Sequence, residues 1–352
     1  MPYFLTFGHD SYGFPMTLYP LKFRPILVPK PWGGRKIARY CPSAAAFQKE
    51  NPNTALGESW VVSDLPDASS VIANGPLAGA TLREVIARFG SGFLGTLTLD
   101  DHGAFPLLVK YLDAAENLSV QVHPDSAYCR THPAARLKSE AWYILEADPG
   151  AVIYKGVKPG VSPERFRDDI KSGKVVDDLL AIPVKAGECH YLPSGTCHAL
   201  GAGVMVLEVQ TPSDTTFRVF DWGRTDRALH IDEALQCIQF GPPDTRRAER
   251  RSHVAGFFVT ASRLCTCRHF QIEKVRMVGE YSQEIAYDRP AIWVILSGKG
   301  RISGSPAGID VPLAAGEVTL VPPRMPDARV EIEEDMVWLD IQFPRVDADL
   351  LA

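Results

Sequence analysis

The residues best suited to chemistry in this 352-residue chain are two histidines, a glutamate and a glutamine with the spacing of a metal site. The segment from Gly187 to His198 reads G-x5-P-x-G-x2-H, in which a strand ends, a turn reverses the chain and the histidine lies on the returning strand. Gln121 and His123 are two residues apart, which places both on one face of a strand, and Glu140 follows them. Two imidazoles, a carboxylate and an amide oxygen can bind one divalent cation. The sequence therefore predicts a metal site formed by these four side chains.

A second copy of the same unit follows without the ligands, which indicates an internal repeat. The aligned pairs are Gly187–Pro193 with Gly316–Pro322, Trp142–Leu145 with Trp293–Leu296, Glu140 with Ala291, and His198 with Asp327. Because the second copy has an alanine in the place of Glu140 and an aspartate in the place of His198, it has no comparable ligand set, and we expect the chemistry in the first copy alone.

Short strands separated by turns are expected to carry these side chains, since 28 glycines and 28 prolines interrupt any long regular element. Strands and loops are expected from residue 18 to 71. Thr81 and Glu84 form a capping box, and Ser162 precedes a proline at a first helical position. Helices are therefore predicted at 81–90, 162–181 and 231–237. The polar stretch 241–252 is expected to link a catalytic unit at 17–240 to a C-terminal unit at 253–347.

Composition also excludes several classes of function. The net charge of −5 argues against nucleic acid as a partner. No apolar run approaches the ~20 residues of a membrane span. The first sixteen residues lack the basic region of a secretory signal. Seven cysteines, an odd number without a CxxC pair, favour reduced thiols and a cytoplasmic protein.

Longer blocks of the chain resemble the zinc-dependent class I mannose-6-phosphate isomerases of the cupin superfamily, in their compact bacterial form. The resemblance extends over residues 18–345 and is weak after 240. Its blocks are Trp32-Gly-Gly, Gly57-Glu-Ser-Trp60, 105–114, 118–125, 138–145, 192–203 and 208–224. It implies a mainly β fold of two cupin-type barrels, a bicupin, with a small helical insertion in the N-terminal half. It also implies one Zn²⁺ per chain, bound by His123, Glu140 and His198 with Gln121 as the fourth ligand.

The activity implied by the resemblance is the interconversion of mannose 6-phosphate and fructose 6-phosphate, in carbohydrate metabolism. A proton moves between C1 and C2 through an enediol, which requires a base and a group that stabilises negative charge. An Fe or Mn ion suits the same ligands, so zinc is inferred from the family. The resemblance gives Arg218 as the catalytic arginine, and this guanidinium stays protonated. Lys138 and Glu208 both remain candidates for the base.

The substrate must also be anchored by its phosphate. The resemblance implies Ser119 and Lys110 for this task, with Lys138 nearby, and a hydroxyl with ammonium groups suits an anion. Trp32 is expected to line the pocket, together with Glu58 and Trp60.

Two other classes of function remain open at this point. The first is a non-catalytic bicupin that binds a sugar or regulates and keeps a vestigial metal site. The second is an Fe(II) cupin dioxygenase, which the two histidines and one glutamate favour but the block 208–224 does not. The expected partner is a small sugar phosphate, and the protein is expected to be a monomer or a homodimer.

Overall fold

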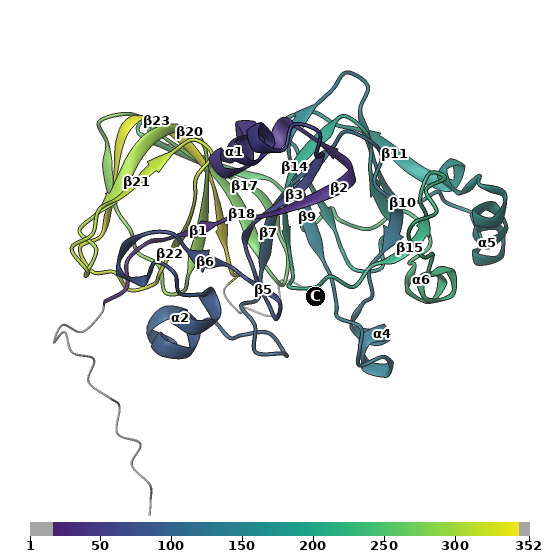
Figure 1. Ribbon diagram of the computed structural model, residues 1–352, viewed down its shortest axis with the longest axis horizontal. Helices are drawn as coiled ribbons and strands as arrows, with labels where there is room; N and C mark the ends of the chain where they lie inside the picture. The colour runs from purple at the N-terminus through teal and green to yellow at the C-terminus, as the bar shows by residue number, and fades with distance from the viewer. Residues whose placement is uncertain (1–16, 345–352) are drawn as a thin grey trace, which may run out of the picture.

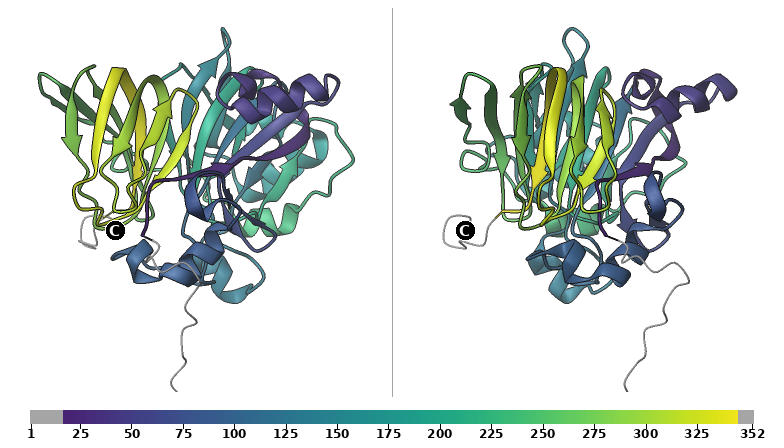
Figure 2. Two further views of the ribbon diagram at one scale, coloured as in Figure 1. Left: turned by 60° about the vertical axis from the view of Figure 1, so that its left-hand side comes forward. Right: turned by 90° about the vertical axis from the view of Figure 1, so that its left-hand side faces the viewer.

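The computed structural model describes residues 17–344, and the fold is mainly β, as the sequence predicts. Three large antiparallel sheets form successive layers (Figures 1 and 2). The five-stranded sheet contains, in order, β11 (Leu179–Pro183), β10 (Val152–Val157), β13 (His198–Leu200), β8 (Val120–Val122) and β15 (Phe217–Phe220). The six-stranded sheet contains β12 (Cys189–Leu192), β9 (Glu140–Ala147), β14 (Val204–Gln210), β7 (Leu108–Ala114), β3 (Leu56–Val62) and β2 (Ile26–Gly34).

The ten-stranded sheet lies on the other side of the molecule, where the C-terminal strands are drawn in yellow and green (Figure 2). Its path is β16 (Ser252–Ala255), β17 (Val259–Thr266), β18 (Gln271–Met277), β23 (Arg329–Gln342), β20 (Ala291–Ser303), β22 (Val318–Val321), β1 (Leu21–Arg24) and β6 (Val71–Ile72). Two further strands pair beside this path, β19 (Ser282–Glu284) on β23 and β21 (Val311–Ala314) on β20. The short strands β4 (Asp64–Leu65) and β5 (Ala68–Ser69) form a separate hairpin.

The six-stranded sheet is the central layer, and both of its faces are buried. One face packs with the five-stranded sheet around Leu112, Trp142 and Leu200. The opposite face packs against the ten-stranded sheet, where Val109 and Leu339 belong to one core. Since a strand buried on both faces needs apolar side chains at successive positions, β14 reads VMVLEVQ and is buried throughout. Glu208 and Gln210 are the polar residues of this strand, and they lie on the face toward the site.

Helices cover the edges, and two of the three predicted segments fit closely. The capping box is present, since Thr81 Oγ1 accepts a hydrogen bond from the Glu84 amide at 3.2 Å and the Glu84 carboxylate accepts one from the Thr81 amide at 2.7 Å. The helices are α1 (Pro42–Glu50), α2 (Leu82–Phe89), α3 (Ser91–Leu94), α4 (Ser126–Thr131), α5 (Pro163–Ser172) and α6 (Ile231–Cys237). Short 3-10 turns lie at η1 (Lys36–Arg39), η2 (Gly75–Leu77) and η3 (Val175–Asp178).

One expectation about helices was wrong. Residues 18–71 were expected to hold only strands and loops, yet α1 lies within them. Its N-cap, Cys41, makes no capping hydrogen bond, and only Ala44 and Gln48 are buried, so this helix carries almost no sequence signal.

The helical segment 162–181 is divided as its glycine predicts. Gly173 ends α5 in the left-handed region, and the short helix expected after it, over 175–180, is the 3-10 turn η3. Only the end of the segment differs, because β11 begins at Leu179.

Strand pairing confirms the internal repeat. Trp142 pairs with His190 between β9 and β12, and its counterpart Trp293 pairs with Thr319 between β20 and β22. Both pairings correspond to the sequence alignment residue for residue. On the other side, Trp142 pairs with Glu208 and Trp293 pairs with Asp340, so these two buried acids are counterparts as well. The two copies share their pairing as well as short motifs.

The ligand positions of the second copy differ as predicted. Ala291 is buried in the place of Glu140. Asp327, in the place of His198, is exposed and lies in the left-handed region at φ 67°, outside any strand. Neither residue offers an inward ligand, and the description of each half as a barrel stays a prediction.

The ten-stranded sheet also contains strands from the beginning of the chain. Leu21 of β1 pairs with Leu320 of β22, and Phe23 of β1 pairs with Ile72 of β6. The division at residues 241–252 stays a prediction. It assigns β1 and β6 to the unit 17–240, although both strands belong to the ten-stranded sheet with the strands of the C-terminal unit. Residues 1–16 and 345–347 of the predicted segments lie outside the described residues.

Two other properties match the composition. All seven cysteines are free thiols. Over residues 17–344, every helix is too short or too polar to cross a lipid bilayer.

Candidate metal and substrate site

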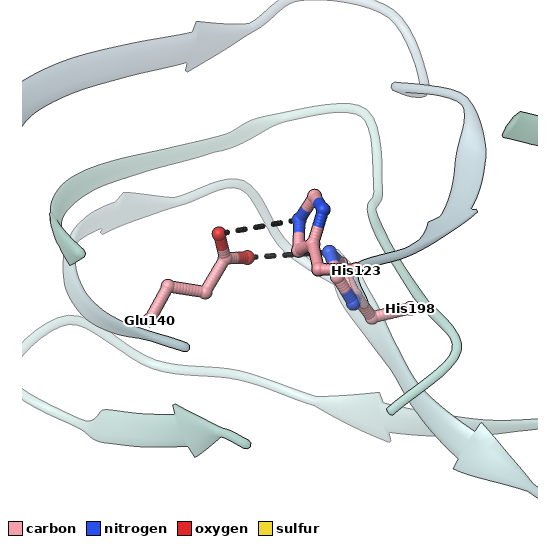
Figure 3. A group of neighbouring side chains, drawn as sticks. All are labelled: His123, Glu140 and His198. Atoms are coloured by element: carbon pink, nitrogen blue, oxygen red, sulfur yellow. Dashed lines mark ion pairs between the residues drawn. The ribbon is translucent and has the colours of Figure 1, made fainter. Parts of the chain in front are cut away.

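Three of the four predicted metal ligands, His123, Glu140 and His198, have their side chains directed at one point (Figure 3). His123 directly follows β8, Glu140 begins β9 and His198 begins β13, so both facing sheets contribute. One ligand atom of each lies within 4.8 Å of the others. Glu140 Oε1 is 3.2 Å from His198 Nε2, and Glu140 Oε2 is 3.5 Å from His123 Nε2. All three residues are buried.

Hydrogen bonds on the outer side of both rings orient them toward this point. His123 Nδ1 lies 2.9 Å from the Thr215 carbonyl oxygen, and His198 Nδ1 lies 2.8 Å from the Thr196 carbonyl oxygen. Because a carbonyl only accepts, Nδ1 of each ring carries the proton and Nε2 presents its lone pair to the site. Burial, together with the ammonium group of Lys138, lowers the pKa of His123 to about 3. The ring is therefore neutral at neutral pH, which is the form that binds metals.

The inner polar atoms fit a bound cation. His123 Nε2 and both carboxylate oxygens of Glu140 are buried without a hydrogen-bond partner in residues 17–344, although Glu140 Oε2 lies 2.8 Å from the Lys138 ammonium group. Buried polar atoms without hydrogen bonds are costly, and a divalent ion would bind these atoms. Gln121 lies beside them, paired with His198 across β8 and β13, with its amide nitrogen 3.4 Å from His198 Nε2. Turning the amide about its own bond would present the oxygen instead.

A chain of alternating charges connects this point to the pocket. Five ion pairs join six residues: Glu140–Lys138 at 2.8 Å, Lys138–Glu208 at 3.7 Å, Glu208–Lys110 at 3.2 Å, Lys110–Glu58 at 3.6 Å and Glu58–Lys30 at 3.3 Å. Two tryptophans hold the carboxylates from the side, since Trp142 Nε1 donates to Glu208 and Trp60 Nε1 donates to Glu58, both at 2.8 Å.

Glu58 and Lys110, toward the outer end of this chain, are ionised at neutral pH. Burial raises the pKa of Glu58, but Lys110 and Lys30 lower it by more, to about 2. Burial lowers the pKa of Lys110, but the carboxylates of Glu208 and Glu58 outweigh it, so the pKa ends above its ordinary value. The pocket wall is thus rich in fixed charge.

A pocket of about 290 Å³ adjoins the three buried ligands through Lys138 and Gln121. His123, Glu140 and His198 do not line it, whereas the other predicted site residues do. These residues are Trp32, Lys110, Ser119, Gln121, Lys138, Glu208 and Arg218, joined by Glu58 and Trp60. Arg218 lies on β15 opposite Gln121, donates through Nη1 to the Ala228 carbonyl oxygen at 3.0 Å, and has a buried Nε without a partner in the described chain. Burial and the nearby Arg227 lower the pKa of Arg218.

Three lining residues with basic side chains were not predicted. Lys30 lies two residues before Trp32 in β2, so the strand period could have placed it on the same face. Arg227 and His230 lie in the loop after β15, where no pattern points to a site. Arg227 is held by Asp221, whose Oδ2 accepts from its Nε at 3.0 Å.

Fold and site together define a mainly β protein whose buried His123, Glu140 and His198 could hold a metal ion, beside a pocket lined by charged side chains. Comparison with known proteins gives the family. Residues 21–149 match the family model for phosphomannose isomerase type I, catalytic domain. The mannose-6-phosphate isomerase of Streptococcus mutans is 37% identical over 290 residues, which are 81% of this chain and 87% of the relative. The probable mannose-6-phosphate isomerase GmuF of Bacillus subtilis is 34% identical over 319 residues, 89% and 96% of the two chains.

Solved structures agree with this result. The mannose 6-phosphate isomerase from Bacillus subtilis superimposes with a TM-score of 0.79 at 29% identity and covers 92% of this chain and 99% of its own. A zinc-bound mannose 6-phosphate isomerase shares the fold at 16% identity, with a TM-score of 0.70 and coverage of 93% and 100%. This chain belongs to the type I mannose-6-phosphate isomerase family, which confirms the resemblance read from its motifs.

Proposed function

We propose that this protein interconverts mannose 6-phosphate and fructose 6-phosphate. The supporting observation is the position of Lys138, Glu208 and Arg218 in one pocket beside the His123, Glu140 and His198 cluster. A base, a fixed cation and a metal-type ligand set in one small space are the groups that an aldose–ketose isomerisation requires.

We propose one Zn²⁺ per chain, held by His123, Glu140 and His198 with the oxygen of Gln121 as a fourth ligand. When bound, such an ion supplies Lewis acidity that stabilises negative charge on sugar oxygens without redox chemistry. The uncompensated buried atoms of Glu140 and His123 support a cation of this kind. The zinc-bound relative supports zinc over iron.

Between the two candidates for the base, the geometry favours Glu208. Its Oε1 is buried and accepts no hydrogen bond in the described chain, and it lies 3.2 Å from Lys110 Nζ, so a lone pair is available for a proton beside a fixed cation. Trp142 holds the other oxygen, Oε2, in a fixed direction at 2.8 Å. Lys138 Nζ lies 2.8 Å from the Glu140 carboxylate and 3.7 Å from that of Glu208, so its ammonium group is held between them. We therefore propose that Glu208 moves the proton and that Lys138 donates to the substrate oxygens.

The phosphate is proposed to bind at the opposite side of the pocket. Ser119 contributes a hydroxyl, and Arg218 and Arg227 add guanidinium groups that match phosphate oxygens. Lys110, the other predicted anchor, lies between Glu58 and Glu208, so its charge also serves to neutralise those two carboxylates. The small-molecule partner is thus a sugar phosphate, and the free thiols support a cytoplasmic location.

The test is an assay of mannose 6-phosphate turnover by the zinc-loaded protein, in which fructose 6-phosphate formation is coupled to NADPH production. Two variants separate the roles. Arg218→Ala should lose more than a hundredfold in rate and keep its metal, whereas His198→Ala should lose the metal. Metal content by atomic absorption distinguishes them, and equal loading of both variants would contradict the assignment.

The same experiment also distinguishes the isomerase from the two other classes of function. No turnover with zinc bound, together with sugar binding, would indicate the regulatory bicupin. Bound iron with oxygen consumption would indicate the dioxygenase.

A further inference from the structure

A second and larger cleft, about 770 Å³, lies between the metal-binding half and the C-terminal half and shares no lining residue with the site pocket. One wall contains the segment 96–102 and the end of α4, which lies at the lower edge of the molecule in Figure 1. The opposite wall is formed by Arg268, His269, Arg289 and Phe343. Cavities of this size are typical of sites for small organic ligands.

Positive charge dominates this cleft. Four arginines line it, Arg130 and Arg136 from the first half and Arg268 and Arg289 from the second. Within residues 17–344, the guanidinium groups of Arg130, Arg136 and Arg268 form no ion pair and no hydrogen bond. Several arginines elsewhere in the chain have carboxylate partners, as in Arg83–Asp64, Arg165–Asp178 and Arg227–Asp221. Here three guanidinium groups without such a partner line one cavity.

The remaining charged groups leave this excess in place. Arg289 donates to the Pro344 carbonyl oxygen at 2.8 Å, and its Nε lies 3.4 Å from Asp288. Two carboxylates, Asp100 and Asp101, also line the cleft. The Asp100 carboxylate accepts hydrogen bonds from the backbone amides of residues 102 and 104, so it is already engaged within its own turn.

Apolar side chains complete the cleft, among them Leu97, Leu99, Leu137 and Phe343. A ligand that fits must therefore carry more than one anionic group on a carbon skeleton. Arginine forks match the oxygens of phosphate in pairs, and a bisphosphate can reach both walls. We propose that this cleft binds a small phosphorylated metabolite with two phosphate groups, held by Arg130 and Arg136 on one side and Arg268 on the other.

The probe for this proposal is fructose 1,6-bisphosphate, titrated calorimetrically into the zinc-loaded full chain. The test variant is Arg130→Ser with Arg268→Ser, since both residues are exposed and their guanidinium groups form no hydrogen bond or ion pair in residues 17–344, so the fold should tolerate their loss. The matched control, Arg246→Ser with Arg301→Ser, removes two charges at exposed positions outside both cavities. The site pocket is present in all three proteins, so any binding there cancels in the comparison.

We expect the wild type and the control to bind the bisphosphate in the cleft and the test variant to bind it there at least tenfold more weakly. Equal binding by all three proteins, or none, would overturn the proposal. Equally tight binding of sulfate by the wild type would also overturn it, because it would show a general anion site. Turnover plays no part in this measurement, so the proposal stands or falls independently of the proposed activity.

Discussion

The buried acid of the second copy provides a sharp test of how the two halves diverged. Asp340 occupies the place of Glu208, but its neighbour across the strands is Glu273, where Glu208 has Lys110. Its Oδ2 accepts hydrogen bonds from Tyr287 at 2.7 Å and Gln342 at 2.8 Å, and its Oδ1 is buried without a partner in the described chain. A carboxyl group in this setting should be neutral over much of the pH range.

Burial raises the pKa of Asp340 from 3.8 to about 7, Glu273 adds to the shift, and the hydrogen bonds from Tyr287 and Gln342 oppose it. Between these two pKa values the folded protein binds a proton that the unfolded chain has released. The contribution to stability is therefore complete below pH 3.8 and is lost as the pH rises through 7. A shift of this size corresponds to about 4 kcal/mol in total, of which about 3 kcal/mol falls between pH 5 and pH 8.

The perturbation is Asp340→Asn, which keeps the shape of the side chain and stays neutral at every pH. Relative to this variant, the free energy of unfolding of the wild type should fall by about 3 kcal/mol from pH 5 to pH 8. Urea unfolding followed by tryptophan fluorescence measures it, because Trp293 and Trp338 lie in the same core. Glu333→Gln, at an exposed position of β23, is the control. Parallel pH profiles of wild type and Asp340→Asn would refute the reasoning.

Three further outcomes are expected. Thr81→Ala should cost about 1 kcal/mol of unfolding free energy in urea titrations, since it removes the N-cap of α2; no loss would show that the capping box contributes nothing. Lys110→Met should destabilise the protein by about 3 kcal/mol and abolish turnover, because Glu58 and Glu208 lose their shared cation; a stable, active variant would contradict the charge chain. Removing zinc with a chelator should lower the melting temperature reversibly, because bound zinc adds about 4 kcal/mol to the free energy of unfolding when free zinc exceeds the Kd a thousandfold. An unchanged melting curve would argue against a resident metal.

The site was more predictable from the sequence than the fold around it. His123, Glu140 and His198 follow local rules, namely the strand period and a turn of fixed length, so their convergence could be predicted. Lys30 and Arg227 reach the pocket through the pairing of distant strands and loops, which no local pattern records.

The same limit applies to the sheets. The alignment of the two copies could be predicted because each copy repeats one local unit, and the strand pairing of Trp142 and Trp293 agrees with it. Helix α1 was not predicted because its apolar face is small. The place of β1 in the ten-stranded sheet was not predicted because neither composition nor periodicity indicates a pairing between strands 299 residues apart.

That pairing of β1 with β22 has a consequence for how the chain folds during synthesis. Leu21 is synthesised 299 residues before its partner Leu320. The ten-stranded sheet therefore cannot close until β22 has been made, and β1 must wait with an unpaired edge, a situation that slows folding and exposes the chain to aggregation. Cutting the polypeptide at residues 241–252 should divide this sheet, because β1 and β6 lie in the first piece and its other strands lie in the second.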